Sequence, residues 1–143
     1  MVACPKPKKV KKKKVKKPTL AKMRKMLDRI WFETIYLRDK GTCQKCGRKD
    51  TLAAHHIFGK KAYPAGRWNL DNGLLLCYAD HIYWAHSKPY EVELFMKDRN
   101  GLFWYDDLFK EVKLISQFRS CYFDRIKGEL ESEQTKLKSN ING

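Results

Sequence analysis

The side chains best suited to chemistry lie between residues 43 and 86, where three of the five cysteines and all four histidines occur. Thiolate and imidazole groups are the ligands that zinc and related transition metals prefer. A single histidine is more often structural than functional. Four histidines beside a thiolate cluster indicate metal binding or acid–base chemistry. They are His55, His56, His81 and His86.

A metal-binding knuckle is predicted from Cys43 and Cys46, which are separated by two residues and are followed by a glycine. The turn brings both sulfurs to one ion, and the glycine relieves backbone crowding. Cys77 is the third ligand that we expect. The fourth is either Asp80, three residues after Cys77, or the adjacent His81, and either would complete a structural zinc site. The alternatives are three unrelated thiols or a zinc site that has lost a ligand.

His55 and His56 adjoin on a predicted strand, over residues 51–57. Successive side chains of a strand point to opposite faces, so the two imidazoles cannot do the same job. One can ligate a metal while its neighbour takes a proton from water.

The elements around these residues are expected to be short. A second strand is predicted over residues 73–77, and residues 58–71 form a loop between the strands. A short helix over residues 80–86 follows, and then a helix over residues 89–100. The loop carries three cations that we expect to contact phosphates, namely Lys60, Lys61 and Arg67. Trp68 is expected to seal the core.

Helices are predicted on both sides of this centre. Thr19 can cap the first, whose apolar residues recur at helical spacing up to Gly41. A last helix is expected to start near Asp106, and its apolar pattern fades after Gly128. Its inward-facing stripe is predicted to be Leu108, Val112, Ile115, Phe118 and Tyr122.

The charge indicates a polyanionic partner. The net charge is +15, and nine of the first 17 residues are lysine. This segment cannot bury a core, so residues 1–17 are expected to be a disordered basic tail that binds phosphates or, alternatively, keeps the protein soluble. The rest of the chain is also basic, and nucleic acid is the usual partner of such a chain.

The N-terminal residues, the hydropathy and the cysteines indicate the cellular compartment in which we expect the protein. The chain starts with lysine and proline rather than a secretion signal, and no apolar run is long enough for a membrane span. We therefore expect a cytoplasmic protein with reduced cysteines and no membrane partner. Cys121 is expected to be a buried apolar residue, and Cys4 is given no role.

The run from residue 43 to residue 86, about a third of the chain, resembles the HNH, or ββα-metal, endonuclease motif. That motif has a Cys-x-x-Cys pair, a histidine pair on the first strand, a loop Asn, then Leu-Cys-x-x-Cys-His and a final helix histidine. This chain departs from it by placing Asp80 where the fourth cysteine would stand. The matching segments, in order, are Cys43-Gln44-Lys45-Cys46, Ala54-His55-His56-Ile57, Asn72-Gly73-Leu74-Leu75-Leu76-Cys77, His81 and His86.

The resemblance implies a role for each matched residue. His56 would be the general base, and Asn72 would brace the loop that holds it. His55 and His81 would be ligands of the catalytic ion, with His86 as the last one. The family commonly places that last ligand four residues after the first helix ligand, whereas His86 is five residues after His81. The two positions differ by about 100° around an α-helix, so His86 can ligate only if the helix is distorted or short.

The fold implied is α+β, with a small ββα-metal core and a zinc knuckle over residues 42–88, flanked by α-helices at both ends. This single domain would span residues 18–130, and residues 131–143 would be a polar C-terminal tail. The segment 69–77 and residues 90–94 also resemble the NinG-type phage recombination proteins, which belong to the same nuclease group and favour a phage origin.

The activity implied is metal-dependent hydrolysis of phosphodiester bonds in DNA. Its cofactors would be a divalent ion (Mg, Mn, Ni or Zn) at the histidines and a structural zinc at the cysteines. Phage replication, recombination or packaging proteins are possible partners. The alternative is a zinc-ribbon protein that binds nucleic acid without cleaving it. A third interpretation, a basic structural or packaging protein, would not need the histidine pair or Asn72.

Overall fold

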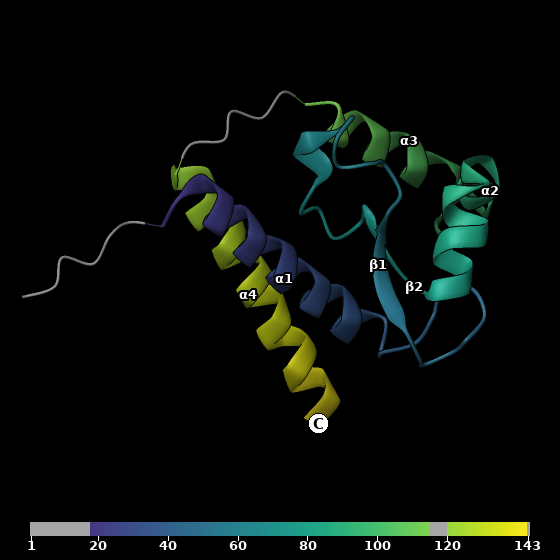
Figure 1. Ribbon diagram of the computed structural model, residues 1–143, viewed down its shortest axis with the longest axis horizontal. Helices are drawn as coiled ribbons and strands as arrows, with labels where there is room; N and C mark the ends of the chain where they lie inside the picture. The colour runs from purple at the N-terminus through teal and green to yellow at the C-terminus, as the bar shows by residue number, and fades with distance from the viewer. Residues whose placement is uncertain (1–17, 115–119, 143) are drawn as a thin grey trace, which may run out of the picture.

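The computed structural model describes residues 18–114 and 120–142, and over this part the predicted α+β class is confirmed: the chain is mostly helical with a two-stranded antiparallel sheet (Figure 1). In order, the elements are α1 (Leu20–Arg38), β1 (Leu52–His56), η1 (Pro64–Gly66), β2 (Gly73–Cys77), η2 (Asp80–His86), α2 (Pro89–Asn100), α3 (Leu102–Val112) and α4 (Ser120–Asn142). The expected basic tail with Cys4, the stripe positions Ile115 and Phe118, and the side chain of Cys121 lie outside the described residues.

Helix α1 begins where the sequence predicts. The hydroxyl of Thr19 accepts a hydrogen bond from the backbone N–H of Lys22 at 3.4 Å, as a helix cap does. The helix ends at Arg38, slightly before Gly41, because the chain reverses there with positive φ. Its buried residues recur mainly every fourth position and face the sheet and α4: Met23, Leu27, Trp31 and Ile35.

Strands β1 and β2 pair so that His56 lies opposite Gly73 and His55 opposite Leu74. All of β2 is buried because both of its faces are covered. Leu75 packs into the apolar cluster with α1 and α4, whereas Leu74 and Leu76 pack into a second cluster with α2. A strand that is covered on both faces has a continuous run of apolar residues in its sequence, and residues 74–77 are such a run.

At Gly73, α1 packs directly against the start of β2. A Cβ atom at Gly73 would lie 2.5 Å from Cδ1 of Ile35 and 2.6 Å from Cζ2 of Trp31. We expect Gly73→Ala to lower the free energy of unfolding by about 1–3 kcal/mol, since an inserted methyl group must displace packed side chains. Chemical denaturation measures the change.

Gly128 supplies the matched control. It lies in α4, and a Cβ atom added there would have no neighbouring atom within 4 Å. Gly128→Ala should therefore raise the free energy of unfolding by about 0.5–1 kcal/mol through helix propensity alone. Equal effects at the two glycines would contradict the close approach of α1 at Gly73.

The C-terminal part of the chain differs from the sequence-based expectation. The single helix predicted from Asp106 is two helices, α3 and α4, and Gly101 with φ 96° separates α3 from α2. The expected polar tail after residue 130 is also wrong for residues 131–142, which continue α4. That helix runs beside α1 in the same direction (Figure 1): Leu130 is buried in the shared cluster, and the Gln134 amide donates to the carbonyl of Ile30 at 3.2 Å. This polar segment is helical because it contains many good helix formers and because its apolar side packs on α1.

Among the described residues, no helix combines the length and the apolar character that crossing a membrane requires.

Candidate functional site

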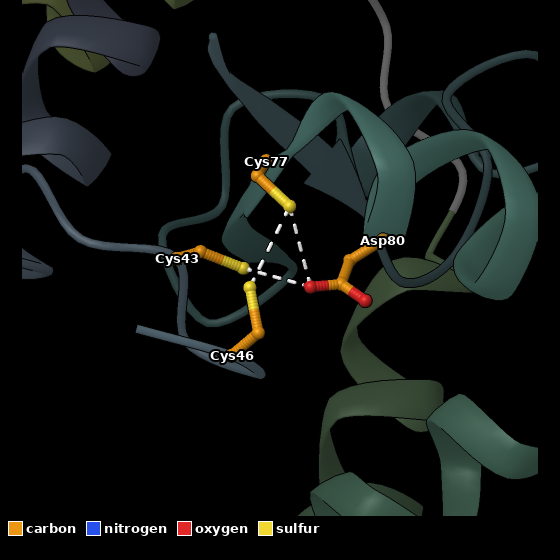
Figure 2. A group of neighbouring side chains, drawn as sticks. All are labelled: Cys43, Cys46, Cys77 and Asp80. Atoms are coloured by element: carbon orange, nitrogen blue, oxygen red, sulfur yellow. Dashed lines mark hydrogen bonds between the residues drawn. The ribbon is translucent and has the colours of Figure 1, made fainter. Parts of the chain in front are cut away.

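The three expected cysteines converge with Asp80 (Figure 2). Cys43 and Cys46 come from the turn after α1, Cys77 ends β2, and Asp80 begins η2. The thiols of Cys43 and Cys77 each donate to Oδ2 of Asp80 at 3.3 Å, and Sγ of Cys46 lies 3.6 Å from Sγ of Cys77. These four donors fit within the span of a single ion, and the cysteines are not in disulfides. The predicted ligand set is therefore assembled, with Asp80 in the fourth position.

Backbone hydrogen bonds shape the turn that carries the first two cysteines. The N–H of Cys43 donates to the carbonyl of Arg48 at 2.7 Å, and the N–H of Gly47 donates back to the carbonyl of Cys43 at 2.9 Å. Gly47 has φ 79°, which favours glycine. The N–H of Gln44 donates to the carbonyl of Leu75 at 2.9 Å and so ties the turn to β2.

The electrostatics of this cluster favour a cation. Burial would raise the pKa of Asp80, but hydrogen bonds from the three thiols and from Lys45 lower it to about 2. The hydrogen bond to Asp80 is the main reason that the pKa of the Cys46 thiol rises to about 12. Zinc binding would deprotonate the three thiols, and three thiolate sulfurs with one carboxylate oxygen form a ligand set that zinc accepts. The ammonium of Lys45, 3.3 Å from Oδ1 of Asp80, offsets part of the negative charge.

The second cluster consists of His55, His81 and His86, which lie together on one side of the sheet. The ring centroid of His55 lies 5.2 Å from that of His81 and 5.0 Å from that of His86, and the last two are 4.7 Å apart. His81 is therefore part of this cluster and not the fourth partner of the thiols. His55 is buried, His81 half-buried and His86 exposed, so the cluster opens to solvent on one side.

The local helix geometry explains how His86 joins the cluster. Residues 80–86 form a π-helix, η2, in which hydrogen bonds connect residues five apart. His81 and His86 are five residues apart and therefore project from the same side, which an α-helix would not allow. The helix therefore has the distortion that would allow His86 to ligate the same ion as His81.

His55 gives the clearest indication that the cluster suits a metal ion. Its Nδ1 is the one buried side-chain nitrogen or oxygen in the described part of the chain without a hydrogen-bond partner. Burial, and then the charges that His81, His86 and His56 can carry, lower the pKa of His55 to about 3, so the ring is neutral. A neutral imidazole with an unpartnered nitrogen, facing two others, fits a divalent transition-metal ion.

His56 points to the opposite side of β1, toward α1. Its ring stacks on Trp31 with centroids 4.2 Å apart and planes 14° apart. Its Nε2 lies 2.8 Å from the carbonyl oxygen of Arg67. A carbonyl only accepts, so Nε2 carries the proton and Nδ1 is the unprotonated nitrogen. Burial lowers the pKa of His56, and the hydrogen bond to Arg67 opposes that effect in part.

Asn72 is fully buried and bridges the two ends of the loop between the strands. Its amide nitrogen donates to the carbonyls of Phe58 at 3.0 Å and Gly66 at 2.9 Å, and its oxygen accepts from the N–H of Phe58 at 2.7 Å. Asn72 thus fixes the segment immediately before Arg67, whose carbonyl holds His56. The bracing contacts expected of Asn72 are present in this loop.

The loop cations differ in how they are held. Lys60 and Lys61 are exposed, whereas the guanidinium of Arg67 forms a two-fold ion pair with Asp28 of α1. Trp68 is buried, as expected, and its indole N–H donates to the same carboxylate at 2.9 Å.

Two residues of α1, Asp28 and Trp31, lie around His56 and were not predicted from the sequence as part of the site. Their three-residue spacing places them on neighbouring positions of one helix side. That spacing predicts that the two side chains lie on the same side of the helix. It does not predict that the loop between the strands packs against that side.

Comparison with known proteins gives no match: no family model, curated protein or solved structure is significantly similar to this chain.

Proposed function

We propose that this chain is a metal-dependent DNA endonuclease of the HNH type, which hydrolyses phosphodiester bonds. The observation that carries the proposal is the three-imidazole cluster with the unpartnered Nδ1 of His55, directly beside His56, whose protonation is set by a backbone carbonyl. A buried nitrogen without a partner costs free energy unless something binds it. A divalent ion is the ligand that suits three convergent imidazoles.

His56 is suited to the role of general base. With its Nε2–H donated to the carbonyl of Arg67, the Nδ1 lone pair can take a proton from a water molecule. The water oxygen then forms a bond to phosphorus, and the bond from phosphorus to the leaving oxygen breaks. His56 is the last residue of β1, so its ring and the histidine cluster border the end of the same strand from opposite sides.

A divalent ion held by His55, His81 and His86 would stabilise the negative charge that develops on the phosphate and the leaving oxygen. Because His86 is exposed, the cluster borders solvent on that side, and a phosphodiester would approach the ion from there. The exposed Lys60 and Lys61 would contact neighbouring phosphates, consistent with the basic charge of the chain.

The thiolate cluster has a different proposed role. A zinc ion held by Cys43, Cys46, Cys77 and Asp80 would have four protein ligands, which is the arrangement of a structural site. It would tie the turn after α1 to the end of β2 and the start of η2.

The test combines metal analysis with nicking of supercoiled plasmid across Mg²⁺, Mn²⁺, Ni²⁺ and Zn²⁺. We expect His86→Ala to lose the ion of the histidine cluster, to keep the zinc of the thiolate cluster, and to lower nicking by at least about tenfold, because a side chain that binds the ion is removed. Tyr83→Ala is the control, since Tyr83 lies on the same short helix but is 69% exposed.

The alternative function, nucleic-acid binding without cleavage, predicts a different result. The wild-type chain would then bind DNA with a steep dependence on salt but would nick it with none of the four ions. That outcome would remove the nuclease proposal and leave the zinc site in place.

A further inference from the structure

We propose that Asp28 of α1 is a positioning residue for His56, acting through the peptide group between Arg67 and Trp68. This inference rests on the proposed function in one respect, which is that His56 is the base. Helix α1 lies outside the segment 43–86 that resembles a nuclease motif, so Asp28 would give a functional role to a flanking element.

The carboxylate of Asp28 accepts three hydrogen bonds from the loop between the strands. Its Oδ1 accepts from Nε of Arg67 at 2.8 Å and from Nε1 of Trp68 at 2.9 Å, and its Oδ2 accepts from Nη2 of Arg67 at 2.6 Å. Three donors from two consecutive residues thus end on one carboxylate. Two-fold arginine–carboxylate pairs fix direction as well as distance.

The two residues that Asp28 holds flank the peptide group that contacts His56. The carbonyl that accepts from Nε2 of His56 belongs to the peptide group joining Arg67 to Trp68. Asp28 holds the side chains on both sides of that peptide group. Because the peptide group is planar, fixing both flanking residues restricts the direction in which the carbonyl points.

The imidazole of His56 also contacts α1 directly. Trp31, three residues after Asp28 on α1, stacks on the His56 ring, and its own indole N–H donates to the carbonyl of Asn69 at 3.0 Å. One side of α1 therefore contacts His56 in two ways. Trp31 stacks directly on the face of the ring, and Asp28 acts on the Nε2 proton indirectly, through the carbonyl of Arg67.

The consequence is a fixed tautomer. A neutral imidazole carries its proton on one of its two nitrogens, and the hydrogen bonds that the ring makes decide which. If the Arg67 carbonyl turned away, His56 would populate the form with hydrogen on Nδ1, which cannot accept a proton from water at that atom.

The experiment measures this tautomer directly. We would record ¹⁵N–¹H long-range correlation spectra of imidazole-labelled, zinc-loaded full-length protein and assign His56 by the signal missing from His56→Ala. The wild type should show only the Nε2–H form, and Asp28→Ala should show a mixture of both forms. Asp28→Asn, which keeps one acceptor oxygen, should lie between them, and it replaces Asp28→Ala if that variant does not fold.

Glu33→Ala is the matched control. Glu33 is another carboxylate on α1 in an arginine ion pair, with Arg29 at 2.8 Å, but it lies away from the loop. It should keep the wild-type tautomer. Folded Asp28 variants with the wild-type tautomer would overturn the proposal, as would a Glu33→Ala spectrum that changes equally.

Cleavage kinetics give the second readout. For Asp28→Ala, kcat should fall about tenfold, less than the roughly 10²–10⁴-fold that a general base typically supplies, while KM for DNA does not rise. A rise in KM with unchanged kcat would overturn positioning and assign Asp28 to DNA binding. If the wild-type chain nicks no DNA, the proposed function fails, and the spectra still decide whether Asp28 fixes His56.

Discussion

Replacing His56 with alanine is expected to lower kcat for plasmid nicking by about 10²–10⁴-fold, the range that a general base contributes. Both metal ions should remain, because His56 points away from the histidine cluster toward Trp31. Single-turnover nicking with saturating metal measures the effect, and elemental analysis measures the metal content.

The loss of the stack on Trp31 must be separated from the loss of the base. His56→Phe keeps an aromatic ring in that place and cannot take a proton, so it should be nearly as inactive as His56→Ala but more stable. If either variant nicked DNA at the wild-type rate, His56 would not be the base. Activity regained by His56→Phe alone would show that the ring matters only for packing.

The sequence allowed the central elements to be predicted because their signals are local. A continuous apolar run gave β2 its bounds, and the paired cysteines and clustered histidines gave both candidate metal sites. The η2 helix was placed correctly, but its π geometry was not predictable, since nothing in the sequence besides the spacing of His81 and His86 distinguishes it from an α-helix.

Features that depend on distant packing were not predictable. The helical pattern was expected to fade after Gly128, although Leu130, Leu137 and Ile141 continue it at helical spacing. The contact of this segment with α1, such as that of Gln134 with Ile30, could not be predicted. The ion pair of Asp28 with Arg67 joins residues 39 positions apart. Because a pairing over this distance is not visible in the sequence, Arg67 was expected to contact phosphate, whereas its guanidinium forms an ion pair with Asp28.

Another charged pair shows how strongly α1 is tied to the sheet. The guanidinium of Arg38 donates to the carboxylate of Asp39 and to the carbonyls of Leu70 at 2.7 Å and Gly73 at 2.8 Å, and Asp39 in turn accepts from the N–H of Leu75 at 3.0 Å. Helix α1 is thus bound to β2 at its C-terminal end and to the His56 loop at its middle. A helix that the sequence placed only as a flanking element supports the candidate site directly.

Disrupting the thiolate cluster is expected to have the largest effect on stability. Cys77→Ser should remove the structural zinc and lower the melting temperature by at least about 10 °C. A zinc ion held by this cluster would tie three segments of the chain together, and zinc binding contributes about 10–16 kcal/mol in small zinc domains, comparable to the whole stability of a protein. Elemental analysis and thermal denaturation, with and without a chelator, measure the two changes.

Two further variants test whether Asp80 is the fourth ligand. Asp80→Cys should keep zinc and resist chelation at least as well as the wild type, because four sulfurs form a complete tetrahedral site. Asp80→Ala should lose zinc to the chelator far more readily. Lys45→Ala is the control, since it removes the ammonium 3.3 Å from Asp80 but no ligand, and it should retain the ion. Equal retention by Asp80→Ala and the wild type would show that the three thiolates hold the ion without Asp80, and the anchoring of η2 to the turn after α1 would then have to come from packing alone.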